Sequence, residues 1–122
     1  MKSYQDLRVY QLAFQYAKEI HLLTLKLPKH ELFELGSQVR RSAQSVRANI
    51  VEGYGRKRYK KDFIHFLTQA YGSCLETTSH LAMLHELYPK LGFNPYIQMY
   101  DNLGAKIFAF ISYVDNSWIT DN

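Results

Sequence analysis

Basic residues are concentrated in one part of the chain, residues 40–61, where their chemistry favours binding to phosphate. This stretch holds eight of the 15 lysines and arginines, and only two acidic residues, Glu52 and the adjoining Asp62, lie within or beside it. Eight positive charges against two negative ones leave a local charge of +6, compared with +4 for the whole chain. The predicted phosphate contacts are Arg40, Arg41, Arg47, Arg56, Lys57, Arg58, Lys60 and Lys61.

Arginine predominates among these cations, and its planar guanidinium group pairs with phosphate oxygens in a bidentate manner. Tyr54 and Tyr59 are interleaved with the basic residues, and tyrosine rings can stack on unpaired bases. Contact with nucleic acid is therefore the leading interpretation, through phosphate contacts that give affinity with little sequence specificity. The alternative interpretation is a polar helix face that only water covers.

The residue types used in catalysis and metal binding do not occur in a recognisable pattern. No glutamate is followed by a histidine three positions later, as di-iron bundles require, and His80 and His85 lie five positions apart, on different sides of a helix. Cys74 falls on an apolar stripe, which favours a small core residue over a nucleophile. We therefore expect a protein with no catalytic residues, no metal ion and no cofactor.

One arginine–histidine spacing resembles a ribonuclease motif. Arg58 and His65 match the Arg-x(4–6)-His pattern of helical-bundle ribonucleases of the HEPN type. With six arginines and five histidines in 122 residues, such a spacing arises readily by chance. A HEPN-like ribonuclease therefore remains a lesser alternative to binding without catalysis.

Length and composition indicate one globular domain, residues 1–122. Hydrophobic residues make up 47% of the chain and charged residues 21%, which is ordinary for a globular protein. The single cysteine cannot form an internal disulfide, which suits the reducing cytoplasm, and the first residues lack the apolar segment of a signal peptide. No apolar run approaches the roughly 20 residues that span a bilayer. We expect a cytoplasmic protein that does not contact membranes.

Apolar residues recur at helical spacing in four segments, which predicts helices at about 6–26, 34–52, 59–88 and 95–117. Asp6 is the expected N-cap of the first helix, and Gly53 and Gly55 are expected to end the second. Asn94 is expected to cap the fourth helix, with Pro95 at its first position. Four helices with short connections favour an all-α, up-down-up-down antiparallel four-helix bundle.

The fourth predicted helix carries a second apolar stripe beyond the one that a bundle core needs. Phe108, Ile111 and Trp118 belong to this stripe. On a monomer they would form an exposed apolar patch, and large patches of this kind mark surfaces that bind other proteins. We therefore predict a homo-oligomer with these three residues at the subunit interface.

Three segments carry a pattern that extends beyond helical periodicity: YQDLRVYQLAFQYAKEI, SQVRRSAQSVRANIVEGYGR and KKDFIHFLTQAYGSCLE. This pattern resembles the small four helix bundle protein family, which includes the 23S rRNA-intervening sequence proteins encoded within bacterial large-subunit ribosomal RNA genes. The middle segment is the most specific, and the resemblance extends over about residues 4–114. Arg47 stands where the family has a proline, Val51 where it has a small alanine, and Tyr59 where it has a helix-capping serine.

The resemblance implies a four-helix subunit that assembles into a homopentamer with a central channel. It also points to related accessory proteins of diversity-generating retroelements, which use a basic surface to engage RNA and a reverse transcriptase. It implies no catalytic residues. We therefore predict a non-enzymatic, oligomeric bundle that binds RNA or a ribonucleoprotein. The alternative is a protein-interaction scaffold for an acidic partner such as a reverse transcriptase.

Overall fold

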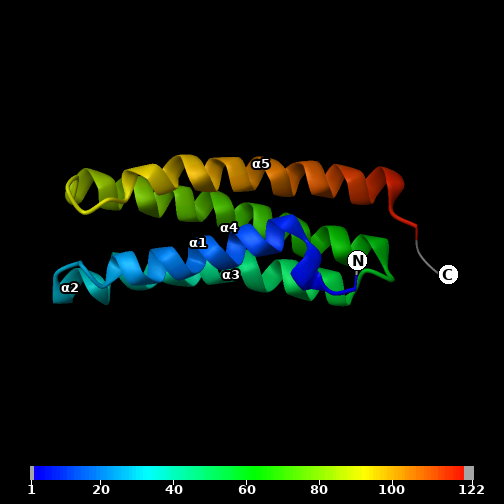
Figure 1. Cartoon of the computed structure of the whole chain (residues 1–122), viewed down its shortest axis with the longest axis horizontal. Helices are drawn as coiled ribbons and strands as arrows, with labels where there is room; N and C mark the ends of the chain where they lie inside the picture. Colours follow the sequence, from blue (N-terminus) through cyan, green and yellow to red (C-terminus); the bar gives the residue numbers. More distant parts are fainter. Residues whose placement is uncertain (1, 120–122) are drawn as a thin grey trace.

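The chain is all-helical in the computed structural model, which describes residues 2–119. Four long helices pack against one another, and no strand occurs among these residues (Figure 1). The elements are η1 (Tyr4–Asp6), α1 (Arg8–Thr24), α2 (Lys29–Leu32), α3 (Leu35–Gly55), α4 (Lys60–Leu87) and α5 (Asn94–Ser117). In the same part of the chain, no helix combines the length and the apolar character needed to cross a bilayer.

Helix α3 packs most extensively against α4 and also against α1, whereas the contact between α1 and α5 is much smaller. Figure 1 shows the α1–α3 and α4–α5 connections at one end of the molecule and the α3–α4 turn at the other. Two hydroxyl pairs join α3 to α4, Ser42 to Thr77 and Ser45 to Ser73, each at 2.8 Å between oxygen atoms. Because these side chains are short, the hydrogen bonds hold the two helices close together.

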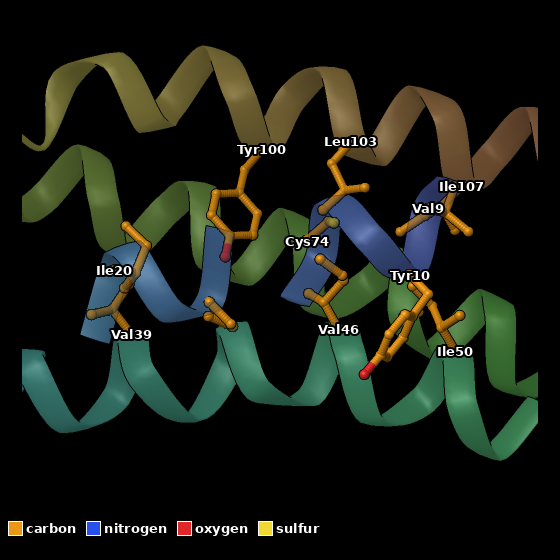
Figure 2. Packing of buried hydrophobic residues seen from close by; sticks show 14 of the residues in the cluster. Val9, Tyr10, Ile20, Val39, Val46, Ile50, Cys74, Tyr100, Leu103 and Ile107 are labelled. Carbon is orange, nitrogen blue, oxygen red and sulfur yellow. The ribbon is translucent and has the colours of Figure 1, made fainter. Parts of the chain in front are cut away.

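Buried apolar side chains from the four long helices form one cluster (Figure 2). Ala13 and Ala17 of α1 and Ala43 of α3 are almost completely buried and contribute little volume to it. Tyr100 of α5 reaches into the space between the helices, is 0% exposed, and its ring centroid lies 5.7 Å from that of Tyr16 on α1. The large tyrosine ring thus connects α5 to α1, the two neighbouring helices with the least backbone contact.

Gly53 lies inside α3, so the prediction that it ends this helix was wrong. A Cβ atom at Gly53 would lie 3.2 Å from the Cβ of Phe66 and 3.3 Å from the carbonyl oxygen of Phe63, both on α4. The missing side chain therefore permits the close approach of the two helices. Helix α3 continues to Gly55, where an added Cβ would have no neighbour within 4 Å.

The starts of α1 and α5 also differ from the prediction. The carboxylate of Asp6 accepts a hydrogen bond from the backbone N–H of Ser3 at 3.1 Å, so Asp6 belongs to the capping box of η1, and Leu7 is the N-cap of α1. Asn94 is the first residue of α5 and follows the N-cap residue Phe93. Neither Leu7 nor Phe93 caps with its side chain, and burial of both instead anchors the helix starts in the core.

We predict that Gly53→Ala lowers the free energy of unfolding by about 1–3 kcal/mol, because the added methyl group would press on Phe66 and on the backbone of Phe63. Gly72→Ala is the matched control. Gly72 is exposed within α4 and an added Cβ would meet no atom within 4 Å, so alanine should raise the free energy of unfolding by roughly 0.5–1 kcal/mol. Urea unfolding followed by circular dichroism measures both changes. Equal stability of Gly53→Ala and the parent would contradict the tight α3–α4 contact.

Candidate nucleic-acid interface

Five of the predicted phosphate contacts lie together where α3 meets α4. The turn at residues 56–59 carries three of them, and the first two residues of α4 are the others. We call this group the basic corner; it consists of Arg56, Lys57, Arg58, Lys60 and Lys61. Two acidic residues, Glu52 and Asp62, adjoin it, so that five positive charges against two negative ones leave a local charge of +3.

The end of α5 holds the basic corner in place. The indole N–H of Trp118 donates a hydrogen bond to the carbonyl oxygen of Lys57 at 3.2 Å, and the Lys60 ammonium donates to the carbonyl oxygen of Asp115, also at 3.2 Å. The Trp118 ring packs edge-on against Phe63, with ring centroids 5.1 Å apart. The backbone that carries the corner cations is therefore fixed from both sides, by α4 and by α5.

Each of the three cations on the turn lies close to an aromatic ring. The distances from the charged group to the ring centroid are 4.0 Å for Lys57 and Tyr54, 4.9 Å for Arg56 and Phe66, and 5.9 Å for Arg58 and Tyr59. Contacts of this kind contribute about 0.5–1 kcal/mol at exposed positions and restrict long side chains to fewer rotamers. The turn therefore presents positive groups that are already oriented, and Tyr59 beside them is 56% exposed.

Arg56 is the corner cation that has carboxylate partners. Its Nη2 atom lies 3.0 Å from Oε1 of Glu52, and its Nη1 atom lies 3.9 Å from Oδ2 of Asp62. These side chains are about half exposed, and ion pairs in such positions contribute at most about 1 kcal/mol. A phosphate group can therefore replace either carboxylate at low cost. Within residues 2–119, the other four corner cations form no ion pair.

Arg40 lies near the opposite end of α3, where its guanidinium group bonds inside the subunit. Sixteen residues separate it from Arg56, about 24 Å along a helix. Its Nη1 donates to the hydroxyl of Thr24 at 2.9 Å and its Nη2 to the carbonyl oxygen of Leu32 at 3.0 Å, at the C-terminal ends of α1 and α2, where a cation is favoured. A Cβ on Gly36 would lie only 3.1 Å from Nη1, so this glycine makes room for the arginine. We therefore exclude Arg40 from the interface.

The two remaining predicted contacts lie on different faces of α3. Arg41 is exposed, and its Nη2 atom lies 3.4 Å from the hydroxyl oxygen of Ser37. Arg47 is half-buried and lines a groove between α1 and α3, where its Nε donates to Oε1 of Gln44 at 2.9 Å. The eight cations that are close in sequence are thus divided between the basic corner, two separate positions on α3 and the interior contact of Arg40.

Phe108, Ile111 and Trp118 have different environments, although we predicted that they form one exposed patch. Phe108 is 57% exposed, whereas Ile111 and Trp118 pack partly against the core of their own subunit. Leu75 on α4, which the sequence analysis did not single out, is 53% exposed. Leu75 and Phe108 line a groove of about 430 Å³ between α4 and α5. The exposed apolar surface therefore extends over α4 as well as α5.

Candidate catalytic side chains occupy ordinary structural positions. Burial raises the pKa of the Cys74 thiol to about 12, so the sulfur stays protonated at neutral pH and is a poor nucleophile. His65 is exposed on α4, and Arg58 lies beside Tyr59 on the turn. In the part of the chain that the structure describes, no three His, Cys, Asp or Glu side chains converge as the ligands of a metal ion would.

Comparison with known proteins gives a family match over most of the chain. The family model described as 23S rRNA-intervening sequence protein matches residues 5–108, which include the whole of α1, α3 and α4 and the basic corner. No curated protein matches the chain.

We predict that Arg40→Ala lowers the free energy of unfolding by about 1–3 kcal/mol, because it removes two hydrogen bonds from a charged donor and leaves the Thr24 and Leu32 oxygens without that partner. The neighbouring Arg41→Ala is the control and should change stability by less than about 0.5 kcal/mol, since its side chain is exposed. Thermal and urea unfolding measure both. Similar effects of the two substitutions would refute the structural role of Arg40.

Proposed function

Because the chain belongs to the family of 23S rRNA-intervening sequence proteins, we propose that it is a non-enzymatic helical protein that binds RNA, or a ribonucleoprotein, through the basic corner. The observation that carries the proposal is the arrangement of five cations on and beside one fixed turn, with three of them held close to aromatic rings. A positive surface with little carboxylate compensation fits a polyanion.

Binding would proceed by exchange of weak internal contacts for phosphate contacts. Phosphate oxygens would take the place of the Glu52 and Asp62 carboxylates at Arg56, and they would pair directly with Arg58 and Lys61, which have no ion-pair partner within residues 2–119. Because the turn is already ordered, the protein loses little conformational entropy when the RNA binds. Contacts of this type release counterions and read no base identity, so the affinity should depend strongly on salt and little on sequence.

We predict that the double substitution Arg58→Gln and Lys61→Gln weakens RNA binding at low salt and reduces the slope of log K against log salt by roughly 1.4–1.8, since two phosphate contacts are lost. The matched control replaces Lys29 and Lys90, which are exposed outside the corner, with glutamine. Fluorescence anisotropy of a labelled RNA over a salt series measures both quantities.

Equal salt slopes for the parent and the corner variant would refute the proposed phosphate contacts. Binding of an acidic protein is the competing function, and it predicts a co-purified protein that depends on the same two residues and survives ribonuclease treatment.

We further propose that the chain assembles with copies of itself through the outer face of α4 and α5. Between Asp62 and Glu86, α4 contains three histidines but a single Asp, Glu, Lys or Arg residue, Glu76, and its exposed positions there include Gly72, Leu75, Ala82 and Met83. Leu75 and Phe108 are more than half exposed on either side of the α4/α5 groove. A helix with so few charges is typical of one that is covered on more than one side. The family resemblance leads us to expect five copies, and a ring of five requires head-to-tail contacts.

We predict that the parent protein has a mass in solution above the 14.3 kDa of one chain, and that Leu75→Glu or Phe108→Glu lowers it, because a carboxylate cannot be buried without a partner. Leu25→Glu is the control, since Leu25 is equally exposed but lies on the α1–α2 connection. Light scattering coupled to size exclusion measures the mass, and circular dichroism verifies folding. A parent mass of one chain would rule out self-association.

The up-down-up-down order of the bundle is also part of this proposal. In an antiparallel pair of helices, residue numbers rise along one helix as they fall along the other. The contacts between α3 and α4 follow this pattern, Ser42–Thr77 and Ser45–Ser73. The contacts between α1 and α5 follow it too, Tyr16–Tyr100 and Glu19–Tyr96. The connections at alternate ends of the molecule in Figure 1 agree with this order.

A further inference from the structure

The groove between α1 and α3 combines an apolar floor with a basic rim. It has a volume of about 250 Å³. Phe14, Ala17 and Leu22 of α1 supply the apolar surface, and Phe14 is 50% exposed there. An exposed phenylalanine in a groove offers a ring face to which a flat molecule can bind.

Basic side chains line both sides of this groove. Lys18 and His21 come from α1, and Arg47 comes from α3. No acidic residue is among the residues that line the groove. Glu19, the neighbour of Lys18 in sequence, accepts a hydrogen bond from the Tyr96 hydroxyl of α5 at 2.8 Å, and so faces away from α3. The groove therefore suits an anionic ligand.

The Arg47 guanidinium is oriented by its own helix. Its Nε donates to Oε1 of Gln44 at 2.9 Å, and within residues 2–119 its Nη1 and Nη2 atoms donate no hydrogen bond. A half-buried arginine with two free amino groups beside an apolar floor has unused capacity for a phosphate.

Aromatic rings continue from the groove toward the N-terminal end of α1. The ring centroids of Phe14 and Tyr10 lie 6.0 Å apart, and those of Tyr10 and Tyr4 lie 4.8 Å apart. Figure 1 shows this end of α1 at the same end of the molecule as the α3–α4 turn. Arg47 precedes Arg56 by nine positions, an axial rise of about 14 Å along a helix, so the groove lies toward the end of α3 that carries the basic corner.

We infer that the α1/α3 groove binds an unpaired nucleotide of a single-stranded RNA, with the base against the Phe14 ring and the adjacent phosphate between Lys18 and Arg47. Aromatic rings interleaved with cations are typical of proteins that bind single strands, because every base has a face that can stack. A base inside a duplex cannot reach the floor of the groove, so the preference is for single strands. This inference rests on the proposed RNA-binding function and adds a second contact to it.

The test compares two RNAs of equal length, a fluorescein-labelled oligouridine and a labelled perfect duplex, by anisotropy with the full chain. Phe14→Leu, which keeps apolar volume but removes the ring, should weaken oligouridine binding roughly fivefold or more and leave duplex binding unchanged. Phe14→Trp keeps an aromatic ring and should bind oligouridine as the parent does. Phe33→Leu is the control, since Phe33 is 65% exposed outside the groove. Circular dichroism confirms that each variant is folded.

The charge contacts are tested separately. Lys18→Gln combined with Arg47→Gln should weaken oligouridine binding and lower its salt slope, in addition to the effect of the corner variant Arg58→Gln, Lys61→Gln. If only the corner variant weakens binding, the groove inference is overturned and the proposed function stands. If neither variant weakens RNA binding, the groove inference and the proposed function are both overturned.

A polyglutamate peptide serves as a competitor that carries negative charge without bases. Displacement of oligouridine by the peptide at equal charge concentration, together with an unchanged affinity of Phe14→Leu, would identify the groove as a site for acidic peptides and overturn the assignment to a nucleotide.

Discussion

The close approach of α3 and α4 is the constraint on which the basic corner depends. Gly53 allows the last turn of α3 to run directly against the first turn of α4, where a side chain would meet Phe66 and the Phe63 backbone. Ser42 and Ser45 hold the same two helices together farther along through hydroxyl contacts. Because α3 can continue to Gly55 without separating from α4, only residues 56–59 remain to join them. A turn this short places its cations within a small area.

Crowding positive charge at this position has an energetic cost that the neighbouring groups offset only in part. Lys60 and Lys61 lie at the N-terminus of α4, where the helix dipole disfavours cations by a few tenths of a kcal/mol. Asp62 in the same turn and Glu52 at the end of α3 offset part of this repulsion. Lys60 reduces it further by donating to the C-terminal end of α5, where a cation is favoured. The proposed phosphate contacts would stabilise the remaining positive charge.

Helical periodicity was sufficient to predict the four long helices and most of the core, because burial follows the 3.6-residue repeat. It could not predict Gly53, since a glycine at a helix end and a glycine at a helix crossing look alike until the partner helix is placed. Arg40 and Arg56 belong to one basic stretch in sequence, but the length of α3 separates them. The guanidinium group of Arg40 also donates a hydrogen bond to the carbonyl oxygen of Leu32. Trp118 follows an apolar spacing, yet its indole N–H donates a hydrogen bond to the carbonyl oxygen of Lys57, 61 residues away in sequence. Such long-range polar contacts have no local signature.

The apolar face and the proposed nucleotide groove lie on different elements, and this separation bears on how the two proposed activities combine. Leu75 and Phe108 lie on α4 and α5, whereas the proposed nucleotide groove is formed by α1 and α3. Self-association through the apolar face therefore does not require any of the groove residues. Each added subunit would contribute another basic corner to the same assembly. Weak phosphate contacts on a single subunit would then act together on one RNA, and avidity would supply the affinity that one corner lacks.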